Sequence, residues 1–365
     1  MDLKKMFETL YGHPRQEWID GSGDNEDGWD DARPKMPNIR IPKISRLWLI
    51  LGGLFLLFAV ILPGVAVFIT DLYWFESYGF EAVFWKRFTA RWELFFISLV
   101  PAFLFYWYNW RSAWKSGLMP VGDGSEDAVR TRASKWVIIA AAGLFAAVNA
   151  LNAMGAWGTF LKFIDSTPFG ETDPLFGKDI GFYVFTLPFI NYLQSWLQGV
   201  LTVTLIGTFA SYFMTKSLTF EGAKLTVTMR ARLHMSLLGS LLLIVWGVGY
   251  WLARYEILFS PTGVVYGAGY TDVNILLPAY TILTAAAVAA AVLLMLNFYK
   301  PMWKMSGIII AALLLLGWVA RSFVPGIVQQ YRVKPNEYEL EKPFLHYHLD
   351  YTRRAFGLND VRTID

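Results

Sequence analysis

Residues 47–64 read "LWLILGGLFLLFAVILPG", eighteen consecutive positions without a charged side chain. An α-helix rises 1.5 Å per residue and the hydrocarbon core of a bilayer is about 30 Å thick, so about 20 such residues cross it. The apolar stretch continues as far as Ile69. The sequence therefore predicts a membrane-spanning helix over residues 47–69.

Six further stretches have the same length and apolar character. They cover residues 92–110, 136–157, 189–214, 233–252, 274–298 and 305–328. The first of these six has the weakest pattern, because Pro101 interrupts it and Glu93 lies near its start. The expected fold is an all-α polytopic membrane protein with about seven transmembrane helices.

The composition agrees with a membrane protein. The chain has 365 residues, of which 55% are hydrophobic and only 17% are charged, whereas a soluble domain has about 25% charged residues. Sixteen tryptophans and eighteen tyrosines fit the two lipid–water interfaces, where amphipathic rings gather. The absence of cysteine excludes disulfides and thiolate metal sites. The net charge of +3, without a basic stripe, indicates that nucleic acid is not a partner.

The lysines and arginines are distributed unevenly between the two sides of the membrane. Fifteen flank the spans on the side of the N-terminus, and eight lie on the opposite side. Since the richer side is normally cytoplasmic, the N-terminus is expected inside and, with seven spans, the C-terminus outside. This predicts a multi-pass membrane protein with an extracytoplasmic C-terminal tail.

The sequence divides into three segments. Residues 1–45 form an acidic segment that is expected to be cytoplasmic and largely disordered, because residues 18–34 are acidic, glycine-rich and nearly without aliphatic side chains. Residues 46–328 form the expected membrane domain, and residues 329–365 form the tail. Within the first outer connection, Phe80, Val83, Phe84, Phe88 and Trp92 recur at helical spacing. This pattern predicts an interfacial helix before the second span, with a plain loop as the alternative.

The tail contains "VKPNEYELEKPFLHYHLDYTRRAFGL", residues 333–358, which predicts a short helix. Asn336 and Glu339 have the spacing of a capping box, Pro343 suits the first position of a helix, and Gly357 suits the position after its end. We expect this helix to begin an outer module and to contact protein; a solvated, frayed helix is the alternative. The residues expected to face a partner are Asn336, Glu337, Tyr338, Phe344, Leu349 and Phe356.

Motifs for chemistry are missing from the sequence. It has no H-E-x-x-H, G-x-S-x-G or P-loop pattern, and the acids of the second outer connection do not form a calcium loop. His346 and His348 point apart on a helix. We therefore predict no catalytic, cofactor or metal site. Polar residues inside spans are rare and often functional, and the three that stand out are Arg321, Asn149 and Asn152.

Three blocks resemble the bacterial uncharacterised protein family numbered 0182. They are "TDLYWFESYGFEAVFWKRF" (70–88), "DPLFGKDIGFYVFTLPF" (173–189) and "KPNEYELEKPFLHYHLDYTRRAFGL" (334–358), in the family's order. The resemblance covers about residues 45–361 and implies a multi-pass protein of the bacterial inner (plasma) membrane. It also implies about seven N-terminal spans followed by a long extracytoplasmic region, with no assigned function. Members continue for several hundred residues, so the sequence is a fragment or a short form, or its outer domain is a separate polypeptide.

The nearly uncharged spans and the motif-bearing outer segments favour a non-enzymatic role. The expected function is a membrane scaffold, anchor or complex subunit that holds extracytoplasmic protein. The alternative is a transporter or channel for an apolar or lipid-like solute, which needs no buried charge. An enzyme ranks third.

Overall fold

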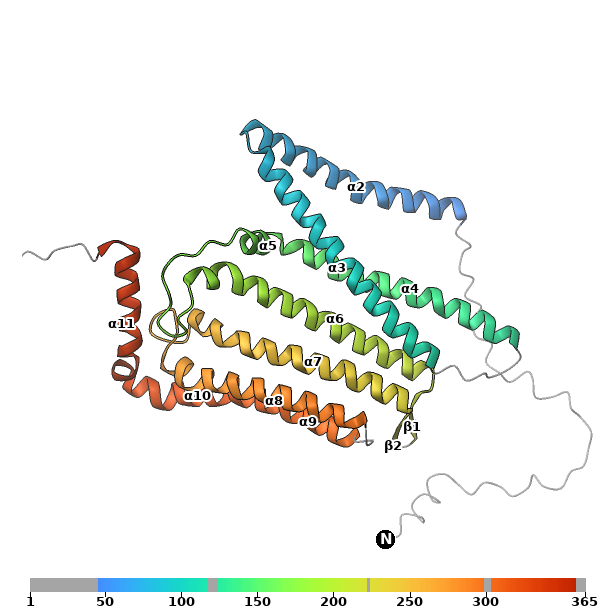
Figure 1. Cartoon of the computed structure of the whole chain (residues 1–365). Helices are drawn as coiled ribbons and strands as arrows, with labels where there is room; N and C mark the ends of the chain where they lie inside the picture. Colours follow the sequence, from blue (N-terminus) through green and yellow to red (C-terminus); the bar gives the residue numbers. More distant parts are fainter. Residues whose placement is uncertain (1–44, 117–123, 222–223, 299–302, 359–365) are drawn as a thin grey trace, which may run out of the picture. The chain divides into compact units, whose positions relative to one another are not determined.

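A computed structural model describes residues 45–116, 124–221, 224–298 and 303–358 (Figure 1). The predicted disorder of residues 1–45 lies outside this range apart from Ser45. The chain divides into two compact units, residues 1–71 and residues 72–365. The first unit contains most of helix α2 (Arg46–Ser77), and all later elements belong to the second unit.

The described part of the chain is almost entirely helical. After α2 come α3 (Glu81–Ser116), α4 (Gly124–Gly155), α5 (Trp157–Ile164), α6 (Leu187–Met214), α7 (Met229–Glu256), α8 (Leu277–Met295), α9 (Trp303–Trp318), α10 (Val324–Val328) and α11 (Glu337–Ala355). Within the described residues, six helical segments are long and apolar enough to cross a membrane. They contain four of the six stretches predicted after residue 91 and all but two or three residues of the other two, 136–157 and 274–298. The remaining predicted span, residues 47–69, falls inside α2.

Four widened helical turns share one cause. The π-helical turns are Phe182–Thr186, Asp272–Leu276, Val319–Phe323 and Gln329–Val333. Each is followed by one residue and then by a proline: Pro188, Pro278, Pro325 or Pro335. Proline has no N–H and its ring clashes with the carbonyl four residues earlier, so the residue before it donates to the carbonyl five residues earlier. The Leu187 N–H to Phe182 O bond is one example.

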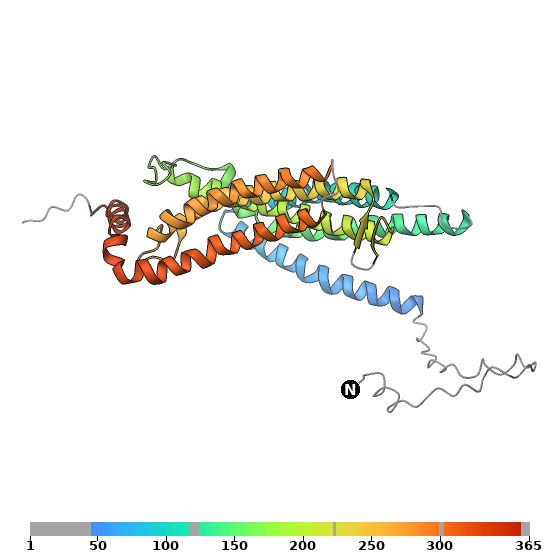
Figure 2. The ribbon, with the colours of Figure 1, turned by 90° about the horizontal axis from the view of Figure 1, so that it is seen from below.

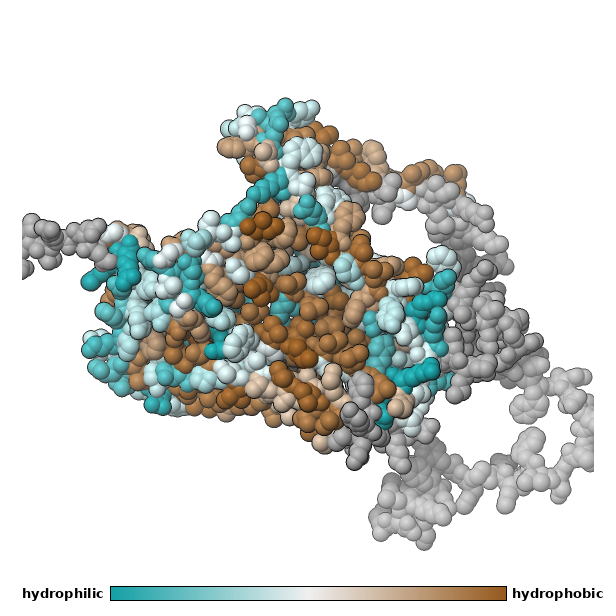
Figure 3. Space-filling view, viewed as in Figure 1, coloured by the Kyte–Doolittle hydropathy of each residue, from teal (hydrophilic) through white to brown (hydrophobic). Residues whose placement is uncertain are grey.

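The helices of the second unit pack mainly on neighbours in the row α4, α3, α6, α7, α8, α9. In Figures 1 and 2, α6, α7 and α8 lie side by side, and α11 runs crosswise over one end of the row. Figure 3 shows hydrophobic residues over the middle of these helices and hydrophilic residues at their two ends. An apolar middle between polar ends is the surface that a bilayer requires.

A chain of polar side chains joins α3, α6 and α7 near the ends opposite α11. Asn109 donates to Phe105 O at 2.7 Å, so its oxygen is left to accept from His234 Nε2 at 2.8 Å. His234 Nδ1 then accepts from the Tyr212 hydroxyl at 3.0 Å. No hydrogen-bond partner of His234 can be identified from the sequence. In the structure its ring bonds to Asn109 and Tyr212 and so connects three helices.

The first outer connection differs from the expected one. α3 runs unbroken from Glu81 through Pro101 to Ser116, so residues 81–92 are its first turns and no separate interfacial helix precedes the span. The chain reverses instead at Gly79, whose φ of 73° is readily adopted only by glycine. No glycine or proline lies between Glu81 and Val100 to end the helix.

The loops contain two further differences from the predictions. A short antiparallel hairpin of β1 (Leu218–Glu221) and β2 (Lys224–Val227) joins α6 to α7 in a chain predicted as all-α. α11 begins at Glu337, so Pro343 lies inside it and not at its first position. Because Pro343 has no N–H, the backbone hydrogen bond from residue 343 to the Glu339 carbonyl cannot form. The turns before Pro343 are nevertheless helical. Asn336 precedes the helix but makes no side-chain capping bond, while Gly357 ends it at φ 64° as expected.

Candidate functional site

Two loops and α11 meet at one end of the second unit. The first loop, residues 165–181, is folded around the buried carboxylate of Asp173. Its oxygens accept the backbone N–H groups of Leu175, Phe176 and Lys178 at 2.7–2.9 Å and the Tyr183 hydroxyl at 2.7 Å. Since carboxylates that accept several N–H bonds are strongly held, Asp173 fixes the loop against the start of the helix that leads into α6.

The Asp179 carboxylate also stabilises this loop through hydrogen bonds. It accepts from the backbone N–H groups of Phe169 at 3.0 Å, Gly170 at 2.9 Å and Gly181 at 2.7 Å. These bonds, the one from Phe169 foremost, lower the pKa of the Asp179 carboxyl below its usual value. Asp173 of "ETDP" and Asp179 of "GKDI" therefore stabilise backbone turns.

Replacing Asp179 by alanine is expected to free three backbone N–H groups and to speed their hydrogen exchange severalfold. Because the folded-state pKa is lowered, the contribution of Asp179 is present above the pKa of the unfolded chain, about 3.9, and is lost as pH falls through the lower folded value. Exchange at Phe169, Gly170 and Gly181 measures this. Glu171→Ala is the control, since Glu171 uses only its backbone in the loop. Equal exchange in the two variants would contradict the assignment.

The second loop, residues 260–271, presents two consecutive N–H groups to two carboxylates. Gly269 donates to Asp272 at 3.0 Å, and Tyr270 donates to Glu341 of α11 at 3.1 and 3.2 Å to its two oxygens. Glu341 is only 3% exposed and Asp272 only 1%. A Cβ on Gly269 would lie 3.0 Å from Glu341 Oε2, so glycine allows this close approach.

Further contacts fasten the two ends of the tail. The Tyr351 hydroxyl, near the end of α11, donates to Thr172 O of the first loop at 2.6 Å. Before α11, Gln329 accepts from the Thr271 hydroxyl, and the Arg332 guanidinium lies 5.6 Å from the ring centre of Tyr270. α11 is thus held at both ends by loops that lie far earlier in the chain.

A cavity of about 350 Å³ lies between α11 and the two loops. Aromatic side chains line it, with Tyr183, Tyr266, Phe344 and Tyr347 among them, together with His348. No group of three or more potential metal ligands occurs among the residues that the structure describes. The lining is thus mostly apolar and aromatic, with Asp173, the tyrosine hydroxyls and the His348 imidazole as its polar groups.

The opposite face of α11 is open. Tyr338 and Leu349 are 66% and 55% exposed and line a shallow hollow of about 590 Å³ together with Lys342, Pro343 and His346. Of the other predicted partner-facing residues, Asn336, Glu337 and Phe356 are exposed outside this hollow, and Phe344 lines the inner cavity. The open face combines apolar and polar groups, as protein-binding surfaces do.

The three polar residues predicted inside the spans lie apart from this end cluster. Asn149 of α4 donates to the Tyr106 hydroxyl of α3 at 3.0 Å, a bond between neighbouring helices. Arg321 places its guanidinium about 6 Å from the ring centres of Tyr250 and Tyr280. Asn152 is exposed on α4. The structure thus does not bring the three together.

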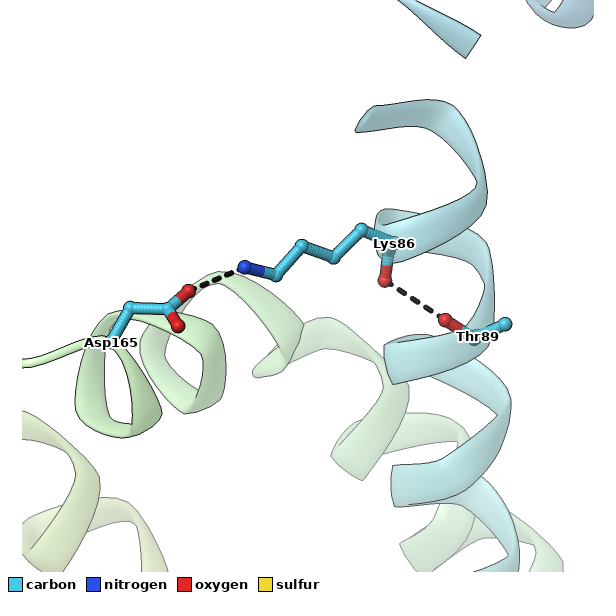
Figure 4. A network of polar contacts seen from close by, with 3 residues as sticks. All are labelled: Lys86, Thr89 and Asp165. Carbon is cyan, nitrogen blue, oxygen red and sulfur yellow. Dashed lines mark hydrogen bonds and ion pairs between the residues drawn. The ribbon is translucent and has the colours of Figure 1, made fainter. Parts of the chain in front are cut away.

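An ion pair connects the start of α3 with the end of α5. Lys86 Nζ lies 2.5 Å from Asp165 Oδ2, and both side chains are more than half exposed (Figure 4). The Thr89 hydroxyl donates to the Lys86 carbonyl at 3.2 Å on the same helix. An exposed pair of this kind contributes about 0–1 kcal/mol, so it adds little to the positioning of the loops.

The residues that hold the site together were not predicted from the sequence. Glu341 stands among charged neighbours in the tail, and its burial depends on Tyr270, 71 residues earlier. Asp272 ends the glycine-containing stretch "GAGYTD" (residues 267–272), whose pattern does not indicate that this carboxylate is buried. The only local signal was the glycine pair Gly267 and Gly269, the first of which has φ 142°.

The fold and the end cluster define a polytopic α-helical membrane protein with a polar helix fixed across one end. A family model described as "Uncharacterised protein family (UPF0182)" matches residues 47–365. The chain belongs to this family.

Relatives in the family are much longer than this chain. A UPF0182 protein of Synechococcus sp. (strain JA-2-3B'a(2-13)) is 34% identical over 85% of the chain and 37% of its own length. One from Micrococcus luteus is 33% identical over 86% and 30%, and one from Thermobifida fusca 31% over 91% and 33%. The chain thus spans about a third of the length of the curated relatives it matches. No solved structure matches the chain.

Proposed function

We propose that this protein is a scaffold, anchor or complex subunit that holds extracytoplasmic protein at the inner membrane. In this proposal seven helices span the bilayer, the N-terminus is cytoplasmic, and the α11 end lies outside. The excess of lysine and arginine near the other end supports this orientation.

The observation that carries the proposal is the two-sided character of α11. Its inner side is fixed through Glu341 and Tyr351, so the helix keeps one orientation. Its outer side presents exposed apolar groups, among them Tyr338, Leu349 and Phe356. A rigid helix with an exposed, partly apolar face loses little conformational entropy when a protein binds to it.

Two experiments test the proposal. A reporter that is active only outside the cytoplasm, fused after Leu358, is expected to be active; activity of only a cytosolic reporter at the same site contradicts the orientation. In mild detergent, the protein is expected to copurify with one partner at a fixed ratio. The triple variant Tyr338→Ala, Leu349→Ala, Phe356→Ala is expected to lose it, whereas the control Leu315→Ala, at an exposed position of α9, keeps it.

A transporter or channel for an apolar or lipid-like solute is the second candidate. An apolar groove among α3, α4 and α6 favours it. A monomer that moves a fluorescent lipid across liposome membranes, with no partner in native membranes, would replace the scaffold proposal with this one.

A further inference from the structure

A groove lies on the outside of α3, α4 and α6, in the half of these helices away from α11. Its volume is about 620 Å³, within the range of about 300–1,000 Å³ typical of ligand sites. Its lining is almost wholly apolar, and the residues that define its floor and ends are Trp110, Trp114, Ser134, Phe145, Gly207 and Met214.

The floor of the groove is a fixed indole ring. Trp110 is buried, stacks on Tyr106 with ring centres 5.3 Å apart, and donates to Thr204 O at 3.2 Å. It lies so close to Gly207 that a Cβ there would be 2.2 Å from the ring. The groove is therefore a built feature of the packing among α3, α4 and α6.

The length of the groove equals one leaflet. Along α4 it extends from Ser134 to Phe145, and along α6 from Val203 to Met214. Eleven residues of helix correspond to about 16 Å, and half of a hydrocarbon core of about 30 Å is about 15 Å. Ser134 and Met214 lie at or near the ends of the apolar stretches 136–157 and 189–214, so this end of the groove is expected near the membrane surface.

Basic residues come shortly after the residues at this end of the groove in the sequence. Lys115 follows Trp114, Lys135 follows Ser134, and Lys216 comes two residues after Met214; all three are exposed. The indole N–H of Trp114, which lines this end of the groove, is buried and has no hydrogen-bond partner in the described part of the chain. This end thus places exposed lysines near an apolar channel, which fits a phosphate above an acyl chain.

We propose that this groove binds an anionic glycerophospholipid, with one acyl chain over Trp110 and its phosphate among Lys115, Lys135 and Lys216. The site stands independently of the scaffold role, because it lies at the end of the helices away from α11.

Native mass spectrometry of the detergent-purified full chain tests this. With equal amounts of phosphatidylglycerol and phosphatidylcholine added, the wild type is expected to retain one phosphatidylglycerol severalfold more than phosphatidylcholine. Ala141→Phe, which fills the groove, is expected to reduce retention severalfold. Ala140→Phe is its matched control, because Ala140 is the adjacent residue of α4, is exposed and lies outside the groove.

The charge is tested separately. Changing Lys115, Lys135 and Lys216 together to glutamine is expected to lower phosphatidylglycerol to the level of phosphatidylcholine. The same change at the exposed Lys162, Lys178 and Lys334, which lie outside the groove, is expected to leave its retention unchanged. The lysine variants keep the test valid if Ala141→Phe does not fold.

A photoreactive acyl chain on phosphatidylglycerol locates the site. Labelling is expected within residues 134–145 and 203–214. Equal retention of the two lipids, or equal retention by Ala141→Phe and Ala140→Phe, overturns the proposal. Loss of a cross-linked protein dimer in Ala141→Phe, without loss of lipid, would instead assign the groove to a protein helix.

Discussion

Glu341→Ala is expected to release α11 from the two loops. Glu341 is 3% exposed, and the variant removes the acceptor of the part-buried Tyr270 N–H, leaving this donor without its partner. Hydrogen bonds to charged groups contribute about 1.5–3 kcal/mol, which lowers the ratio of docked to released helix about 10- to 150-fold. Limited proteolysis within residues 337–355, followed by mass spectrometry, measures this release as faster cleavage.

Two further variants separate the lost hydrogen bond from the lost charge. Glu341→Gln keeps an acceptor for Tyr270 and removes the charge next to buried Asp272, so it is expected to keep α11 protected. Glu339→Ala removes an exposed carboxylate from the same helix and is the control. If Glu341→Ala and Glu339→Ala were cleaved at the same rate, Glu341 would not hold the helix, and the observation behind the scaffold proposal would be lost.

The helical stretches were predictable from the sequence because each depends on local properties. About 20 apolar residues in a row indicate a span whatever they pack against, and six such stretches coincide to within a few residues with parts of the described helices that can cross a membrane. Gly357 also ends α11 as predicted, since a left-handed turn favours glycine.

The site was not predictable because its key contacts join distant residues. The burial of Glu341 results from Tyr270 and Gly269, and the role of His234 results from Asn109, 125 residues away. The start of α11 was predicted wrongly for a similar reason. Pro343 suits the first position of a helix when only its neighbours are considered, but in the structure the chain is already helical before it, from Gln329 onward. A proline predicts a π-helical turn before it only when the helix is known to continue past that proline.

The close contact between Gly207 and Trp110 leads to the largest expected loss of stability. In Gly207→Ala the new methyl group would lie 2.2–2.6 Å from three atoms of the Trp110 ring. The ring cannot move freely, because it is stacked on Tyr106, packs edge-on against Phe145 and donates to Thr204 O. Overpacking of this kind costs about 1–3 kcal/mol, so the melting temperature in detergent is expected to fall by several degrees.

Gly199→Ala provides the matched control on the same helix. A Cβ at Gly199 meets nothing within 4 Å. The only expected effect of the variant is the higher helix propensity of alanine, which raises the free energy of unfolding by about 0.8–1.0 kcal/mol. The two variants make the same chemical change in α6, yet opposite shifts in melting temperature are expected. A rise in both would show that Trp110 yields to the methyl group. The floor of the groove would then be deformable, and it would offer no fixed surface to which a lipid acyl chain could bind.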